Sequence, residues 1–196
     1  MQYRMTLGKT FAIIESIAAE NIKAGRREFM EKRSGVFMVK TNWWYIERLV
    51  WLIAGTDVLG SSILAATHHP NWAFSILFVG LCSICVALTG FCIVGNVLYW
   101  CGVQPLVPDK KTLRNGKWGP VYFMQTDEWF LERYIYVFVG VNLSISSMLA
   151  RFFSPGWLYF TGFVGSATIV FAFTGFCIMA NLLYRLGAEP KMCRFI

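Results

Sequence analysis

Four long apolar stretches, separated by short polar breaks, dominate the pattern of hydrophobic and polar positions. They run approximately from Leu49 to Thr67, Trp72 to Tyr99, Tyr134 to Ala150 and Trp157 to Tyr184. Each is long enough to cross the roughly 30 Å hydrocarbon core of a bilayer as a helix. The second stretch of each pair is longer, which a tilt or a protrusion into the headgroups would accommodate. The pattern predicts an all-α membrane protein with four transmembrane helices in two hairpins.

The two hairpins repeat one another at an offset of 85 residues. The matching positions are Trp44, Glu47, Arg48, Gly55, Pro70, Trp72, Gly80, Thr89, Gly90, Phe91, Cys92, Ile93, Asn96, Gly102 and Pro105, which recur as Trp129, Glu132, Arg133, Gly140, Pro155, Trp157, Gly165, Thr174, Gly175, Phe176, Cys177, Ile178, Asn181, Gly187 and Pro190. A register held without a gap indicates duplication of one supersecondary unit. Because each unit contains two spans, we expect parallel copies related by a pseudo-two-fold axis along the membrane normal. The inverted repeats of many secondary transporters are not available to such a chain.

The repeat and the chain breakers define five segments. They are an amphipathic cytoplasmic or interfacial N-terminal segment (1–43), the first transmembrane hairpin (44–105), a cytoplasmic linker (106–127), the second hairpin (128–190) and a C-terminal tail (191–196). Within the first segment, residues from about Thr6 to Arg33 are expected to form an amphipathic helix that suits the membrane surface or a partner protein. The linker contains proline and glycine breakers and no periodic face.

Composition and charge support the membrane assignment and set an orientation. The chain is 56% hydrophobic and carries a formal net charge of +7, with a mean hydropathy of +0.51, which places it in the membrane class. Basic residues flank the spans, while the two hairpin tips carry only Arg151. The positive-inside rule therefore predicts a multi-pass membrane protein with both termini and the central loop cytoplasmic. Anchoring to anionic lipid explains the charge more simply than nucleic-acid binding.

Residues at the ends of the spans are expected to anchor the protein in the lipid. Trp72 and Trp157 follow the hairpin tips, where they suit the outer interface, and Trp44 and Trp129 belong to the inner aromatic belt. Beside these inner tryptophans stand the repeated Glu-Arg pairs. Arg48 and Arg133 are expected to orient their helices and to extend toward lipid phosphates.

Asp57 is the one acid well inside a span, which makes it a candidate functional residue. Counting back from Tyr99 on the adjacent, antiparallel helix by the distance that separates Arg48 from Asp57 reaches the level of Thr89 to Cys92. We therefore expect Asp57 to hydrogen-bond Thr89 or to approach Cys92. The second copy has Asn142 at the equivalent place, level with Thr174 and Cys177. A shared polar position favours an interhelical hydrogen bond, and a proton relay or ligand site remains the alternative.

The cysteines are compatible with more than one role. Cys92 and Cys177 lie at the same depth after a Thr-Gly-Phe sequence, where each is either a small packing residue or a thiol that needs a polar neighbour for activation. Cys82 and Cys85 are spaced as C-x-x-C, but a zinc site needs four ligands, and the two histidines are near the opposite tip. We expect no metal site, no cofactor and no disulfide framework.

The combined motifs resemble the YgaP-like inner-membrane hairpin family, a domain of unknown function. The resemblance rests on the Glu-Arg opening, the glycine in the first span, the Pro-x-Trp tip and the Thr-Gly-Phe-Cys close followed by Gly-x-x-Pro. Both copies match, over about Trp44 to Pro105 and Trp129 to Pro190. In that family the cysteine is usually followed by proline, and such hairpins can be fused to rhodanese domains that carry persulfide sulfur. Ile93 and Ile178 stand at the proline position here.

These observations predict a non-catalytic membrane protein that packs against a larger complex as an accessory or scaffold subunit. Its expected partners are membrane lipids, other integral membrane subunits or a second copy of itself. One alternative is a handler or transporter of small sulfur or thiol species that uses Cys92 and Cys177. A second alternative is a homodimeric channel in which Asp57 faces water.

Overall fold

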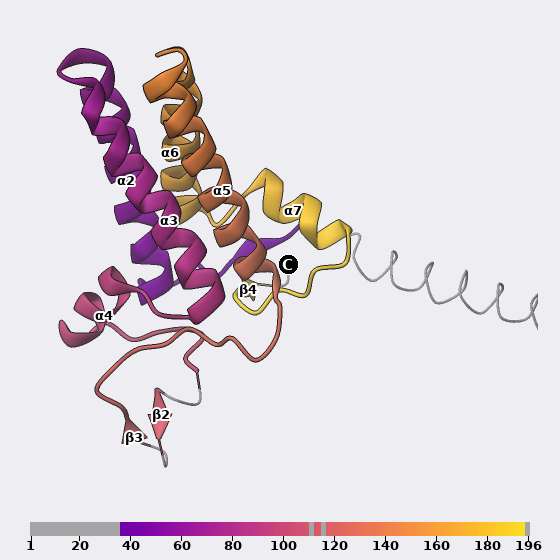
Figure 1. Ribbon diagram of the computed structural model, residues 1–196. Coiled ribbons are helices and arrows are strands. Elements are labelled where there is room, and N and C mark those ends of the chain that lie inside the picture. Colours follow the sequence, from indigo (N-terminus) through magenta and orange to yellow (C-terminus); the bar gives the residue numbers. More distant parts are fainter. Residues whose placement is uncertain (1–35, 110–111, 115–116, 195–196) are drawn as a thin grey trace, which may run out of the picture. The chain divides into compact units, whose positions relative to one another are not determined.

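The computed structural model describes residues 36–109, 112–114 and 117–194 (Figure 1). Apart from Val36, they belong to one unit, Phe37–Phe195. The amphipathic helix expected from about Thr6 to Arg33 lies outside the described residues. The fold therefore begins with the segment that leads into the first hairpin.

Seven helical segments make up most of the described chain. They are α2 (Ile46–Thr67), the 3-10 turn η1 (Pro70–Trp72), α3 (Ala73–Thr89), α4 (Ile93–Trp100), α5 (Leu131–Phe152), α6 (Trp157–Thr174) and α7 (Ile178–Arg185). Two minimal antiparallel strand pairs accompany them, β1 (Met38–Val39) with β4 (Cys193–Arg194) and β2 (Leu113–Arg114) with β3 (Lys117–Trp118). Four helices are long and apolar enough to span a membrane, at Ile46–Thr67, Pro70–Thr89, Leu131–Phe152 and Trp157–Thr174. The predicted all-α fold with four transmembrane helices is confirmed.

The second span of each hairpin is shorter than the hydropathy predicted. α3 ends at Gly90, which has φ +73°, and α6 ends at Gly175, which has φ +72°. This left-handed backbone favours glycine. A Cβ atom on Gly175 would lie 2.6 Å from the carbonyl oxygen of Val39, and one on Gly90 would collide with the carbonyl of Met124. The predictions of continuous helices over Trp72–Tyr99 and Trp157–Tyr184 are wrong. A single residue with left-handed backbone ends each helix, and a hydropathy profile contains no information on backbone conformation.

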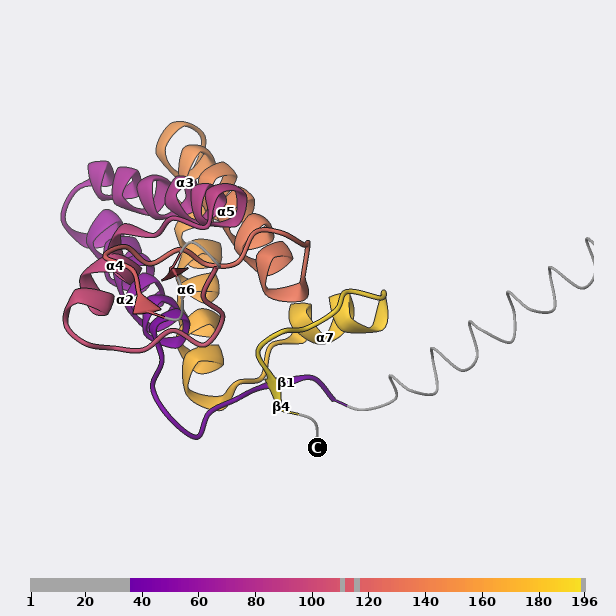
Figure 2. The ribbon, with the colours of Figure 1, turned by 90° about the horizontal axis from the view of Figure 1, so that it is seen from below.

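The helices pair most extensively between the two hairpins, α2 with α6 and α3 with α5 (Figure 1, Figure 2). Glycines meet at both crossings. A Cβ atom on Gly55 would lie 3.0 Å from the carbonyl oxygen of Gly165, and one on Gly80 would lie 3.0 Å from that of Gly140. Small residues let helix backbones approach this closely in membranes. The sequence identified these glycines as repeated positions but did not show that they join one hairpin to the other.

The glycine crossings obey a two-fold relation, because each contact between the copies recurs between the two equivalent residues. Gly55 and Gly140 are equivalent, as are Gly80 and Gly165, so the two crossings are the same contact made twice. At the centre, the rings of Trp51 and Tyr136, which also occupy equivalent positions, lie 6.0 Å apart. This arrangement agrees with the predicted pseudo-two-fold relation, and its axis along the membrane normal stays a prediction.

Candidate functional site

The repeated glutamate at the start of α2 is buried and binds the main chain of the segment that follows its own hairpin. The Glu47 side chain is 2% exposed. Its carboxylate accepts hydrogen bonds from the backbone N–H groups of Leu106 and Val107, at 3.0 and 2.9 Å, and from the Tyr122 hydroxyl at 2.9 Å. Charge-assisted bonds to buried N–H groups are among the stronger hydrogen bonds in proteins. Glu47 thus ties the segment after α4 to the base of α2.

Glu132 makes the same contact in the second copy. Its fully buried carboxylate accepts from the backbone N–H groups of Lys191 and Met192, at 3.2 and 2.7 Å. These two residues are the equivalents of Leu106 and Val107. The position equivalent to Tyr122 is Phe37, which has no hydroxyl. The first copy therefore has a bond that the second lacks.

The repeated arginine binds the end of a helix from the other hairpin. Arg48 donates from Nε to the carbonyl oxygen of Ala172 at 2.6 Å and from Nη2 to that of Phe173 at 3.3 Å. Both carbonyls belong to the last turn of α6, where backbone acceptors lack partners within the helix. A cation is also favourable at the C-terminal end of the helix dipole. Arg133 donates from Nε and Nη2 to the carbonyl oxygen of Ala87, at 2.9 and 2.6 Å, in the last turn of α3.

The prediction that Arg48 and Arg133 extend toward lipid phosphates is wrong. Their side chains are 5% and 3% exposed, and they donate to backbone carbonyl groups. Each guanidinium also lies over the neighbouring tryptophan, at 3.9 Å from the Trp44 ring and 4.1 Å from the Trp129 ring. The sequence predicted the Glu-Arg pairs at the starts of the helices. It could not show that the arginines bind carbonyl groups of residues far away in the chain.

The tryptophans predicted to contact lipid are all exposed at the ends of the hairpins. Trp44 and Trp129 precede α2 and α5, while Trp72 and Trp157 lie beside the tips, at the starts of α3 and α6. Their contact with lipid stays a prediction.

Two asparagines that sequence reasoning did not choose as site residues bind the segments that precede each hairpin. The Asn96 side chain accepts from the Tyr122 backbone N–H at 2.8 Å and donates to the Tyr122 carbonyl oxygen at 3.0 Å. Asn181 makes the same pair of bonds with Phe37, at 2.8 and 3.1 Å. Their recurrence at the 85-residue offset was the signal that could have identified them.

Asp57 lies on an exposed face of α2, and its partner is not the expected one. The Ser75 hydroxyl, near the start of α3, donates to Asp57 Oδ2 at 3.2 Å. The Thr89 hydroxyl instead donates to the carbonyl oxygen of Cys85 at 2.7 Å. The expected bond between Asp57 and Thr89 is wrong, because α3 ends at Thr89 and no continuous helix sets the register that the prediction assumed.

The equivalent position in the second copy is polar but bonded differently. Asn142 Nδ2 donates to the carbonyl oxygen of Phe138, one turn earlier in α5, at 2.8 Å. Phe160 stands at the position equivalent to Ser75, so this copy has no hydroxyl there. Thr174, like Thr89, donates to its own helix, to the carbonyl oxygen of Val170 at 2.7 Å. The two copies therefore share polarity at this level and differ in its pairing.

The repeated cysteines lie at the turns that follow the spans. Cys92 is the residue before α4, and its Sγ accepts from the Gly95 backbone N–H at 3.3 Å. Burial raises the pKa of the Cys92 thiol above its ordinary value. Cys177 is also half-buried and precedes α7, without a side-chain bond to the helix start. Both cysteines are free.

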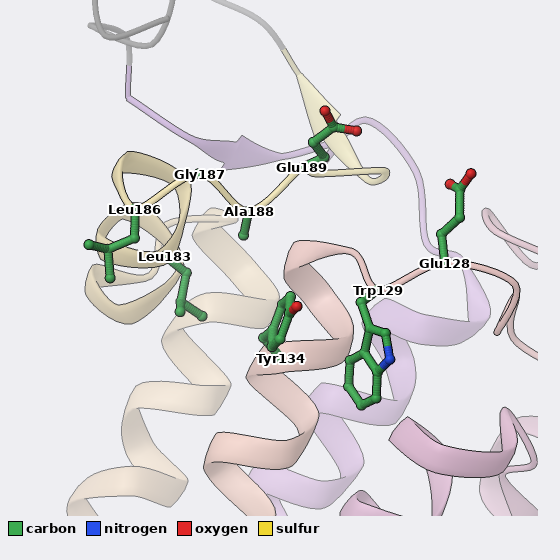
Figure 3. Close-up of a pocket in the computed structure, with 8 residues that line it drawn as sticks. All are labelled: Glu128, Trp129, Tyr134, Leu183, Leu186, Gly187, Ala188 and Glu189. Carbon is green, nitrogen blue, oxygen red and sulfur yellow. The ribbon is translucent and has the colours of Figure 1, made fainter. Parts of the chain in front are cut away.

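An open groove of about 630 Å³ lies between the start of α5 and the end of α7 (Figure 3). Its lining residues are Glu128, Trp129, Tyr134, Leu183, Leu186, Gly187, Ala188 and Glu189. Sequence reasoning named Trp129 among them, as a membrane anchor, and did not predict a groove.

Comparison with known proteins found a family match over part of the chain. Residues 123–191 match the family described as "Inner membrane protein YgaP-like, transmembrane domain". This range contains α5, α6 and α7. Searches of the curated proteins and of the solved structures found no match. The protein is therefore a multi-pass integral membrane protein, and its residues 123–191 are similar to the YgaP-like transmembrane domain.

Proposed function

We propose that this protein is a non-catalytic accessory or scaffold subunit that packs against a larger membrane protein complex. The contacts of its repeated, buried polar side chains support this function. Glu47, Glu132, Arg48 and Arg133 all bind main-chain groups of the protein itself, as do the two asparagines. These contacts stabilise the fold at the bases of the hairpins, and the side chains that make them are not free to bind a substrate.

The observation that carries the proposal is the exposed position of Asp57. An ionisable side chain within a span is expensive unless a partner compensates it, and Ser75 supplies one hydrogen bond. The four spans contain three basic residues, Arg48, Arg133 and Arg151. The first two are buried in their own contacts, and the third lies in the last turn of α5. A cation or donor on a helix of a different protein is therefore the partner that best suits Asp57.

Site-specific photo-cross-linking in native membranes tests the proposal. The probe is placed at exposed Ile53, one turn before Asp57, in the full-length chain. We expect an adduct with one particular integral membrane protein, and a much lower yield of that adduct in Asp57→Asn. This variant suits the purpose because it installs the residue that the second copy carries at the equivalent place, Asn142. Adducts with lipid or with a second copy alone would overturn the proposal.

Sulfur handling is a second candidate function, favoured by the equivalent positions of Cys92 and Cys177 just outside the spans. The raised pKa of Cys92 opposes it, because a protonated thiol is a poor nucleophile. Persulfide labelling of the full-length protein and of a variant with both cysteines changed to serine tests this candidate. Equal labelling of the two proteins would remove it.

The family match over residues 123–191 supports a location in the inner membrane, and the distribution of basic residues supports an orientation with both termini in the cytoplasm. A single cysteine at position 68 or 154, in a background without other cysteines, should then react with an impermeant thiol reagent added outside the cell. Reaction only after the membrane is permeabilised would reverse this orientation.

A further inference from the structure

The groove between α5 and α7 has chemically distinct sides. Figure 3 shows the carboxylates of Glu128 and Glu189 directed away from the spans, and the side chains of Trp129 and Leu183 directed along them. Leu186, which is 74% exposed, adds further apolar surface. The groove thus presents a charged rim beside an apolar wall, which suits an amphiphilic ligand.

Glu128, which lines the groove, forms an ion pair with Lys191, which lies outside the lining. Lys191 Nζ lies 3.0 Å from Glu128 Oε2, and the side chains are 24% and 72% exposed. Glu189 is exposed and adds a second carboxylate to the groove. A ligand with an ammonium group and a phosphate complements this set, since carboxylates attract the ammonium and Lys191 attracts the phosphate.

Aromatic rings extend the surface that can attract an ammonium. The rings of Trp129 and Tyr134 lie 5.3 Å apart, and both side chains are exposed. Aromatic faces bind ammonium groups by cation–π attraction. The guanidinium of Arg133 already covers one face of the Trp129 ring, at 4.1 Å from its centroid, which leaves the Tyr134 ring and the other face of Trp129 for a ligand. Carboxylates beside aromatic rings therefore favour a cationic headgroup over an anionic one.

The groove lies where a phospholipid headgroup can reach it. The third span begins at Leu131, three residues before Tyr134, whereas α7 follows the end of the fourth span. The volume of about 630 Å³ falls within the roughly 300–1,000 Å³ typical of small-molecule sites. We infer that this groove binds the headgroup of a phospholipid that carries a primary ammonium, with an acyl chain along Leu183 and Leu186. This site is independent of the proposed accessory function.

The first copy lacks the same chemistry and supplies matched controls. Trp43, Leu49 and Gln104 stand at the positions equivalent to Glu128, Tyr134 and Glu189. Glu189→Gln and Tyr134→Leu therefore install residues that the duplicated unit already carries. Both variants are expected to fold, because the two original side chains are exposed.

Native mass spectrometry of the full-length protein, released from detergent after incubation with defined lipids, tests the inference. We expect more retained phosphatidylethanolamine than phosphatidylcholine or phosphatidylglycerol. Glu189→Gln should lower its retention about tenfold, the effect of losing one charge-assisted hydrogen bond. Tyr134→Leu should lower it in the same direction, and Gln104→Glu in the first copy should leave it unchanged.

Two results of this experiment would contradict a binding site for a lipid with a primary ammonium: the wrong lipid preference, or variants without effect. Equal retention of the three lipids, or a preference for phosphatidylglycerol, would overturn the inference. Unchanged retention in both Glu189→Gln and Tyr134→Leu would overturn it as well. Soluble phosphoethanolamine that competes as well as the lipid would identify a soluble ligand and would contradict the proposed acyl-chain contact.

Discussion

Arg48 donates a hydrogen bond to the carbonyl oxygen of Ala172, 2.6 Å away and 124 positions later in the chain. Arg133, its equivalent, donates to Ala87. Each hairpin thereby completes the end of a helix in the other hairpin. With the glycine crossings between α2 and α6 and between α3 and α5, these bonds make the two copies one interdependent unit.

Replacing Arg48 with glutamine should destabilise the protein strongly. The variant loses the donors to Ala172 and Phe173 in a site where the side chain is 5% exposed. Buried carbonyl groups without donors and the lost charged contact should lower the free energy of unfolding by about 3 kcal/mol. Denaturant titration in detergent micelles measures the change. Lys40→Gln, at an exposed position, is the control and should change stability little.

Glycine substitutions should separate interface packing from helix propensity. An alanine Cβ at Gly80 would lie 2.7 Å from Ser144 Oγ and 3.0 Å from the Gly140 carbonyl oxygen, whereas one at Gly60 would meet no atom within 4 Å. Gly80→Ala should force α3 and α5 apart and lower the free energy of unfolding by about 1–3 kcal/mol. Gly60→Ala should be neutral or stabilising by up to ~1 kcal/mol. Equal melting temperatures for the two variants would contradict the close crossing.

Because Tyr122 is buried, the free energy of unfolding should fall as the pH becomes alkaline. Burial, and next the charge of Glu47, raise the pKa of the Tyr122 hydroxyl well above its ordinary value. Because the folded pKa exceeds the unfolded one, the contribution is full below about pH 10 and is lost as the pH rises toward the folded pKa. Tyr122→Phe should lower stability at neutral pH by ~1–2 kcal/mol and flatten the decline above pH 10. Unfolding titrations of both proteins from pH 7 to 11 provide the comparison.

Thiol modification should distinguish the cysteines of the first copy. Cys101 is exposed, whereas Cys92 is half-buried with a raised pKa and accepts a bond from Gly95. In single-cysteine variants at pH 7, a maleimide should therefore modify Cys101 faster than Cys92. The rates can be followed by mass spectrometry of the folded protein, with the denatured protein as the control. A faster reaction at Cys92 would indicate an activated thiol and would favour sulfur handling.

The sequence predicted the features that depend on hydropathy and on the repeat. Apolar length located the four spans, and the 85-residue offset matched Gly55 with Gly140 and Glu47 with Glu132. It could not show that Gly55 packs against Gly165, because hydropathy carries no information on which helices touch.

The candidate site was harder to predict, because its contacts join residues far apart in the chain. The partners of Arg48 are carbonyl groups, which every residue has, so no side-chain pattern identifies them. The predicted partner of Asp57 was wrong because α3 ends at Gly90, and this end depends on the backbone conformation of one residue. The roles proposed for Asp57, Cys92 and Cys177 stay predictions.

Disulfide trapping between the copies tests the central claim of interdependent hairpins most directly. The hydroxyls of Ser62 in α2 and Thr161 in α6 lie 2.8 Å apart, and both side chains are buried. Cysteines at these two positions, in a cysteine-free chain with a protease site in the 106–127 linker, should form an intrachain disulfide under mild oxidation. After cleavage the two halves should then migrate together on a non-reducing denaturing gel, while the single-cysteine controls separate. Halves of the double variant that separate, or that form only interchain dimers, would contradict the account.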